Sequence, residues 1–145
     1  MNTGCVLVVE DNQDDQLLTL RALRKQGFDN PIIVKNDGVE ALEFLRSSMS
    51  DEESSLPSLI LMDLKMPRID GHEVLKQIKG DTKLRHIPVV LLTSSRELRD
   101  IAGAYDLGAN SYVRKPVDSQ QFNDVAHHLC RYWLDINETA SAVEN

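Results

Sequence analysis

Residues 59–63 read Leu59-Ile60-Leu61-Met62-Asp63, a run of apolar side chains that ends in a carboxylate. The same order occurs at Val8-Val9-Glu10-Asp11, and two later runs end in a hydroxyl at Thr93 and in an ammonium at Lys115. Unbroken runs of Val, Ile and Leu are typical of parallel strands, which are buried on both faces. The carboxyl ends of such strands meet at one edge of the sheet, so these polar groups are expected to share one cleft.

Five apolar runs, separated by stretches with helical periodicity, set the expected fold. They lie near residues 5–9, 31–35, 58–62, 88–92 and 111–113. Regular alternation of strand and helix predicts an α/β domain, in which right-handed crossovers join a parallel sheet that helices cover on both faces. We assign residues 1–135 to one domain, too short to include a second output domain, and residues 136–145 to a polar tail that is expected to be flexible.

The charge balance disfavours two classes of partner. The chain has 145 residues, with 16 Lys and Arg against 23 Asp and Glu and a net charge of −7, so neither nucleic acid nor an anionic membrane is an expected partner. No apolar run reaches the roughly 20 residues of a membrane helix, and the N-terminus lacks the features of a signal peptide. We therefore expect a cytoplasmic protein in which Cys5 and Cys130 are reduced thiols.

The order of the motifs resembles the receiver domain of two-component response regulators, from about residue 5 to residue 133. Besides the strand ends, three local signatures resemble those of the family: Asp37-Gly38-x-Glu40-Ala41-Leu42, Met66-Pro67-x-x-Asp70-Gly71 and Gly108-Ala109-Asn110. The resemblance implies a doubly wound, flavodoxin-like three-layer sandwich with a five-stranded parallel sheet of order 2-1-3-4-5. It also implies a stand-alone signalling protein rather than an enzyme, one that catalyses only its own phosphorylation and dephosphorylation.

The resemblance gives each polar group a role. Asp63 resembles the phosphoryl-accepting aspartate, Glu10-Asp11 the acid pair, and Lys115 the lysine that binds the phosphoryl group. Thr93 resembles the switch hydroxyl and Tyr112 the switch aromatic. Asp63 would take a phosphoryl group from a sensor histidine kinase, Thr93 would move inward, and Tyr112 would fill the vacated space. The surface of the fourth helix, fifth strand and fifth helix would then change shape.

Three carboxylates in one cleft need a compensating positive charge. At 4 Å and an effective dielectric near 20, each pair repels by about 4 kcal/mol. Mg²⁺, a hard cation that takes oxygen ligands, offsets this repulsion. We expect Asp11 and Asp63 to bind it directly and Glu10 to act through water or from outside the ligand set, while the resemblance adds the backbone carbonyl of Lys65. Glu10 is one methylene longer than the aspartate common in the family, so its coordination mode stays open.

Each of these residues also has a simpler explanation. Glu10-Asp11-Asn12 could cap the first helix, and Asp63 could be a turn residue. Thr93 could end a strand, Lys115 could face solvent, and Tyr112 could be a core residue. Four suitable polar groups at four strand ends are improbable as independent accidents. The hypothesis that these residues form one shared site is therefore favoured.

Two rival functions remain at this point. A phosphatase of the haloacid dehalogenase type also uses an aspartate nucleophile and Mg²⁺, but it needs Asp-x-Asp after its first strand, where this chain has Asp11-Asn12-Gln13. A degenerate receiver would only scaffold other proteins, and the complete set of polar groups disfavours that function.

Capping residues and spacing predict the helices. Asp37, Ser94-x-x-Glu97 and Asp118-x-x-Gln121 mark the starts of the second, fourth and fifth helices. The apolar face of the fourth helix consists of Leu98, Ile101, Ala102 and Tyr105. Residues 46–57 are expected to form a solvated loop. The family resemblance also implies a cis peptide bond between Lys115 and Pro116.

The C-terminal aromatic segment predicts an interface. Phe122, Val125, Ala126, Leu129 and Trp133 form one helical stripe, whereas Tyr132 and Leu134 fall outside it. We therefore expect a symmetric homodimer through the fourth helix, fifth strand and fifth helix, with Tyr132, Trp133 and Leu134 at or beside the contact. The alternative is a monomer in which Trp133 closes the core. This ending also resembles response regulators that pair with bacterial phytochrome kinases, which implies such a kinase as the partner.

Overall fold

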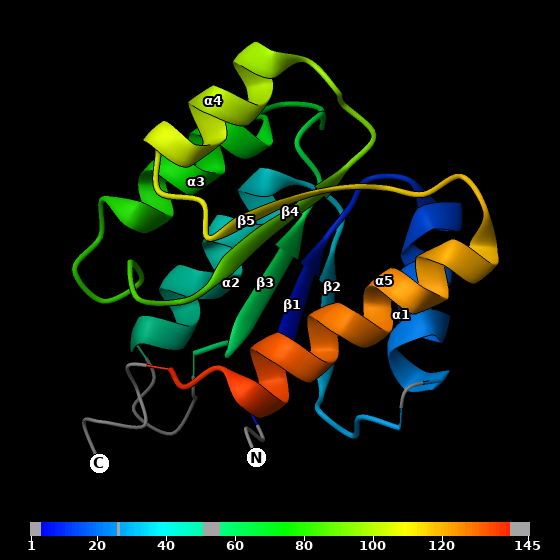
Figure 1. The fold of residues 1–145 in the computed structure, drawn as a ribbon. Helices are drawn as coiled ribbons and strands as arrows, with labels where there is room; N and C mark the ends of the chain where they lie inside the picture. Colours follow the sequence, from blue (N-terminus) through cyan, green and yellow to red (C-terminus); the bar gives the residue numbers. More distant parts are fainter. Residues whose placement is uncertain (1–3, 26, 51–55, 140–145) are drawn as a thin grey trace.

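The computed structural model describes residues 4–25, 27–50 and 56–139. Strands and helices alternate along the chain, as the apolar runs predict (Figure 1). The strands are β1 (Val6–Val9), β2 (Ile32–Lys35), β3 (Leu59–Met62), β4 (Val89–Thr93) and β5 (Ser111–Arg114). The helices are α1 (Gln13–Lys25), α2 (Gly38–Ser50), α3 (Gly71–Lys79), α4 (Leu98–Asp106) and α5 (Ser119–Cys130), followed by the π-helix η1 (Arg131–Ile136).

The strands form one parallel sheet of order β2-β1-β3-β4-β5, which confirms the predicted fold class. Helices α1 and α5 cover one face, and α2, α3 and α4 cover the other, so the molecule has three layers (Figure 1). Strands β1, β3 and β4 are buried along their whole length, whereas the edge strands β2 and β5 are partly exposed. This burial explains why the central strands are unbroken apolar runs.

The sheet separates two apolar cores. Successive side chains of a strand point to opposite faces, so Leu7 packs with α2 and α3 while Val8 packs toward α1 and α5. Each fully buried aliphatic side chain contributes roughly 1.5–3 kcal/mol. The helices on both faces therefore pack against the same strands, and this packing holds the carboxyl ends of the strands in place.

Aspartates begin three of the helices. Asp37 accepts a hydrogen bond from the backbone N–H of Glu40 at the start of α2, and Asp70 accepts one from Glu73 at the start of α3. Asp118 accepts two at the start of α5, as predicted. The prediction of a capping box at Ser94 and Glu97 is wrong, because α4 begins at Leu98 and Glu97 makes no side-chain capping bond.

Helix α4 turns much of its apolar face to solvent. Leu98 is 83% exposed and Tyr105 is 49% exposed, while Asp100 and Ala104 are the buried residues of the helix. Spacing alone does not distinguish a core-facing stripe from an exposed one. Polar contacts of Asp100 with Ser95 and Lys65 set the orientation of α4 instead.

Helix α2 is longer than the sequence predicts. Residues 46–50 continue the helix to Ser50, so the expected loop begins later. Ser48 is buried, Met49 packs against the core, and the Ser50 hydroxyl donates to the carbonyl of Arg46 (3.0 Å). Helical hydrogen bonding thus outweighs the weak helix preference of serine. Residues 51–55 of the predicted loop lie outside the described residues.

The π-helix changes the phase of the C-terminal segment. The prediction that Leu134 faces a partner is wrong, because Leu134 is 1% exposed and packs with Val6, Leu23 and Leu129. A π-turn has a wider spacing than an α-turn, so the positions after Cys130 rotate relative to the α-helical stripe. Tyr132 remains half exposed, and its ring meets that of Trp133 edge to face, with centroids 4.9 Å apart.

Other sequence predictions have mixed outcomes. The Lys115–Pro116 bond is trans, since no cis peptide occurs among the described residues, and the prediction of a cis bond is wrong. The trans form is the commoner one before proline, and Lys115 reaches the site with it.

Both cysteines are free thiols, and burial raises the pKa of Cys130 to about 12. No helix in the described part of the chain could span a membrane. The flexible tail stays a prediction: Ile136 belongs to η1, and residues 140–145 are outside the described part.

Candidate functional site

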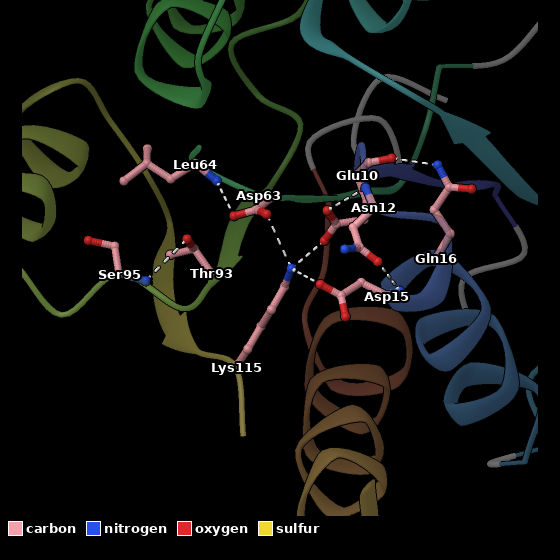
Figure 2. Close-up of polar contacts among 9 residues, drawn as sticks. All are labelled: Glu10, Asn12, Asp15, Gln16, Asp63, Leu64, Thr93, Ser95 and Lys115. Atoms are coloured by element: carbon pink, nitrogen blue, oxygen red, sulfur yellow. Dashed lines mark hydrogen bonds and ion pairs between the residues drawn. The ribbon is translucent and has the colours of Figure 1, made fainter. Parts of the chain in front are cut away.

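The register of the sheet brings the polar strand ends together. Val9 pairs with Met62 across β1 and β3, so Glu10 and Asp63 leave neighbouring strands at the same level. Beyond the strands, the backbone N–H of Asp63 donates to Val9 (3.0 Å) and that of Lys115 donates to Thr93 (2.8 Å). These bonds hold the strand ends side by side. The predicted convergence at one edge is therefore present, as Figure 2 shows for Glu10, Asp63, Thr93 and Lys115.

Glu10, Asp11 and Asp63 form an acidic cluster. One carboxylate oxygen from each lies within 4.8 Å of the others. Glu10 is buried, Asp63 is half-buried and Asp11 is exposed, so the cluster opens toward solvent on one side. Carboxylate oxygens at this spacing suit a hard divalent cation such as Mg²⁺, which keeps some water ligands. The described donor set therefore fits the expected metal.

Lys115 sits among three carboxylates. Its ammonium donates to Asp63 (3.2 Å), to Asp15 (3.0 Å) and to Glu10, with which it makes the shortest contact of the three. The side chain of Lys115 is only 11% exposed. It is thus a buried cation at the centre of the cluster, not a solvated surface lysine (Figure 2).

The sequence reasoning missed Asp15. Its side chain comes from the first turn of α1, and its backbone N–H donates to the side-chain oxygen of Asn12 (3.0 Å). Asp15 belongs to the acidic pair in the first turn of α1, directly after the Glu10-Asp11 strand end, and this closeness in sequence could have indicated its position. The simpler explanation offered for this region also holds in part, because Asn12 caps α1 while Glu10 and Asp11 join the acidic cluster.

Burial and the contacts between Glu10 and Lys115 shift the pKa values of both residues. Burial raises the pKa of Glu10 to about 7, against the hydrogen bond from Lys115 that lowers it. Burial would lower the pKa of Lys115, but its hydrogen bond to Glu10 and the charges of Asp63 and Glu10 outweigh burial and raise that pKa. Lys115 therefore stays protonated at neutral pH and offers a permanent positive charge to an anion at Asp63.

Asp63 is held in a defined orientation. One of its carboxylate oxygens accepts from the backbone N–H of Leu64 (2.7 Å), and the other accepts from Lys115. The turn that follows requires Gly71, because a Cβ there would lie 2.8 Å from the carbonyl oxygen of Asp63. This close approach explains the Asp70-Gly71 pair of the sequence motif, which keeps α3 tight against the candidate nucleophile.

The loop between β3 and α3 has a second anchor. Arg68 lies in the left-handed region, with φ 66°, and its guanidinium donates twice to Asp37 at the start of α2 (3.0 and 2.5 Å). Backbone and Arg68 hydrogen bonds to the Asp37 carboxylate lower its pKa, so the pair stays charged. The loop that contains Lys65 is thus fixed at both ends. The role of the Lys65 carbonyl as a metal ligand remains a prediction.

Thr93 and Tyr112 meet at the loop between β4 and α4. Thr93 is fully buried, and its hydroxyl accepts a long hydrogen bond from the N–H of Ser95 (3.4 Å). The hydroxyl of Tyr112 donates to the carbonyl of Ser95 (3.0 Å). The predicted switch residues therefore contact the same short loop, although this contact does not test a movement.

Asp100 is a further residue that the sequence reasoning missed. It is 5% exposed, accepts from the Ser95 hydroxyl (2.6 Å) and lies 3.3 Å from the ammonium of Lys65. The Ser95 hydrogen bond, followed by the Lys65 contact, lowers the pKa of Asp100. The carboxylate joins α4 to the loops that follow β3 and β4. An acid inside an apolar-looking helix was the available signal.

Several known proteins are similar to this chain in sequence and fold. The chain is 40% identical to a probable methanogenesis regulatory protein, FilR2, of Methanothrix harundinacea, over 92% of this chain and 86% of FilR2. It is 35% identical to the response regulator Rcp1 of Synechocystis, over 90% of this chain and 88% of Rcp1. The crystal structure of the phosphorylated cyanobacterial phytochrome response regulator RcpA superposes with a TM-score of 0.88, at 34% identity, over 97% of this chain and 99% of RcpA.

One further structure bears on the metal. Rcp1 has been solved in a Mn²⁺-bound form, and it superposes on this chain with a TM-score of 0.84 at 34% identity, over 93% of this chain and 97% of Rcp1. A family model of the response regulator receiver domain matches residues 6–127, which include every strand and the whole acidic cluster. The chain therefore belongs to the response regulator receiver family.

Proposed function

We propose that this protein accepts a phosphoryl group on Asp63 from a phosphorylated histidine of a sensor kinase, in a Mg²⁺-dependent reaction in the cytoplasm. The observation that carries the proposal is the position of Asp63, which lies within the acidic cluster and 3.2 Å from the ammonium of Lys115. Glu10 also combines these two contacts, but it is buried, whereas Asp63 is half-buried and more accessible to a donor. The phospho-acceptor role is general to receiver domains, and the assignment to Asp63 is ours.

In the transfer, an oxygen of the Asp63 carboxylate forms a bond to phosphorus. The P–N bond to the kinase histidine breaks at the same time, and its electron pair stays on the imidazole nitrogen. Lys115 and the Thr93 hydroxyl donate to phosphoryl oxygens and position the group. Mg²⁺ held by Asp11 and Asp63, with the Lys65 carbonyl, would supply positive charge against those oxygens.

Mass spectrometry of the intact protein tests the acceptor. With acetyl phosphate and Mg²⁺, the wild-type protein should gain one phosphoryl group, and Asp63→Asn should gain none. Asp106→Asn, which changes an exposed acid at the end of α4, serves as the matched control and should behave like wild type. Labelling of Asp63→Asn, or equal labelling in excess EDTA, would contradict the proposal, and a wild-type protein that gains no phosphoryl group would favour a scaffolding role.

We also propose a phytochrome-type kinase as the partner. RcpA is a phytochrome response regulator, and the structure of the bacteriophytochrome response regulator AtBRR, 44% identical in sequence, superposes over 95% of this chain with a TM-score of 0.72. An autophosphorylated phytochrome kinase should transfer its label to this protein within seconds to minutes. An unrelated histidine kinase should transfer it much more slowly. Equal rates from both kinases would remove the support for this partner.

For the output, we propose a symmetric homodimer through α4, β5 and α5. The apolar exposure of Leu98, of Tyr105 and of Val117, which is 98% exposed, supports this face. Half-exposed Tyr132 would lie at the contact with Trp133 beside it, whereas Leu134 is buried within the domain and would not take part. Light scattering should show a dimer that Leu98→Glu weakens. Leu17→Glu, at a half-exposed position on α1, is the control that should leave it intact. A wild-type monomer with and without phosphorylation would exclude the dimer.

A further inference from the structure

The ammonium of Lys115 has no donor to spare. An ammonium carries three N–H groups, and the three carboxylates of Glu10, Asp15 and Asp63 accept from them. A phosphoryl oxygen that binds Lys115 must therefore replace one of these partners. The question is which carboxylate can be replaced at the smallest cost.

The three carboxylates differ in how far their side chains are exposed to solvent. The side chain of Asp15 is 38% exposed, compared with 5% for Glu10 and 13% for Asp63. A carboxylate that loses a cation must be solvated by water instead, and only an exposed one can be solvated without opening the core. Glu10 is also held by the N–H of Asn12 (3.2 Å) and would be left buried without its counter-ion.

Asp15 is also separate from the expected metal ligands. The acidic cluster consists of Glu10, Asp11 and Asp63, and Asp15 approaches it only through Lys115. Its place on α1 is fixed by the hydrogen bond from its own N–H to Asn12, so it can release Lys115 without moving the helix. Figure 2 shows Asp15 on the α1 side of the ammonium, opposite Asp63.

We propose that Asp15 is a positioning residue that holds one donor of Lys115 while the site is empty and yields it to a phosphoryl oxygen. The inference rests on the proposed phosphorylation of Asp63. Asp15 competes with the phosphoryl group for the same N–H, and its negative charge opposes the incoming anion. Both effects act in the same direction, so loss of the Asp15 charge raises the affinity of the site for a phosphoryl mimic.

Beryllofluoride with Mg²⁺ is the probe, and its affinity is measured by 19F NMR titration. Asp15→Asn keeps the size of the side chain and one acceptor oxygen but removes the charge. We expect it to bind about fivefold more tightly than wild type, the size typical of an ion pair with one solvent-facing partner. Asp14→Asn is the matched control: it removes the same charge from the neighbouring exposed position of α1 and should change affinity less than twofold.

Titrations in a Lys115→Met background distinguish competition for the Lys115 donor from a general effect of negative charge on beryllofluoride affinity. There, Asp15→Asn should have no larger effect than Asp14→Asn, because the shared donor is gone. Equal effects of the two substitutions in the native background would overturn the proposal, and so would weaker binding by Asp15→Asn. An effect of Asp15→Asn that survives in Lys115→Met would do the same. If wild type itself bound no beryllofluoride, the proposed function would fail first, which is a separate outcome.

Discussion

Helices α3 and α4 are each nine residues long and lie on the same face of the sheet, but different forces hold them (Figure 1). Val74, Leu75 and Ile78 of α3 are all completely buried in the core. Helix α4 instead buries an acid, Asp100, and turns Leu98 outward. One helix is held by apolar burial, and the other largely by directional polar contacts.

This difference bears on signalling. A helix packed by its apolar side chains cannot shift without opening a void, whereas hydrogen bonds can be exchanged for others at small net cost. The contacts of Asp100 reach Lys65, two residues after Asp63, and Ser95, two residues after Thr93. Helix α4 is therefore joined to both loops of the candidate site by bonds that are suited to rearrangement.

The largest effect is expected in the core of α3. Ile78→Ala should lower the free energy of unfolding by about 2–5 kcal/mol, since the side chain is completely buried and leaves a cavity. Urea unfolding followed by circular dichroism measures this loss. A cost below about 1 kcal/mol would mean that the core of α3 relaxes easily and would weaken the contrast with α4.

The next effect concerns the polar attachment of α4. Asp100→Ala should lower the free energy of unfolding by about 1–3 kcal/mol, because the Ser95 hydroxyl and the Lys65 ammonium both lose their partner. Lys65→Met, which removes only the more exposed partner, is the control and should cost less than about 1 kcal/mol.

The Asp100 contribution should depend on pH in a defined direction. Hydrogen bonding to Ser95 and the contact with Lys65 hold the pKa of Asp100 below its ordinary value in the folded protein. The ionised form therefore stabilises the fold above about pH 4, the pKa of an unfolded aspartate, and this contribution is lost as the pH falls through the folded pKa. Unfolding curves of wild type and Asp100→Asn should converge toward acidic pH. A difference that grows on acidification would contradict this assignment.

The helix caps provide a smaller contrast. Asp70→Ala should destabilise the protein by about 1 kcal/mol, because the N–H of Glu73 loses its acceptor. Glu97→Ala at the equivalent position of α4 should cost almost nothing, since Glu97 makes no capping bond. Thermal unfolding of the two variants measures both effects. Equal losses would show that α4 is capped in solution after all.

The smallest effect is expected on the exposed face of α4. Leu98→Ala should change the free energy of unfolding by less than about 0.5 kcal/mol, because the side chain is 83% exposed. Denaturation at a concentration low enough to keep the chain monomeric is the measurement. A loss comparable to that of Ile78→Ala would mean that Leu98 packs against the domain.

The sequence determined the sheet, the strand ends and two of the helix caps. Buried parallel strands require unbroken apolar runs, and the first polar residue after each run must leave the sheet at one edge. Glu10, Asp63, Thr93 and Lys115 could therefore be assigned to one cleft before the structure was known. Asp37 and Asp118 act on backbone groups two or three residues away, and such short-range contacts are visible in the sequence itself.

Only the tertiary structure decided which side chains meet across the layers. Asp15 and Lys115 are 100 residues apart and pair because α1 begins, and β5 ends, at the same edge of the sheet. Asp100 is buried, and Leu98 is exposed, because loop contacts rotate α4 away from its apolar periodicity. Leu134 turns inward because a π-helix changes the spacing after α5. Periodicity describes neighbours along one element, while these contacts depend on how separate elements pack and on the local geometry that packing selects.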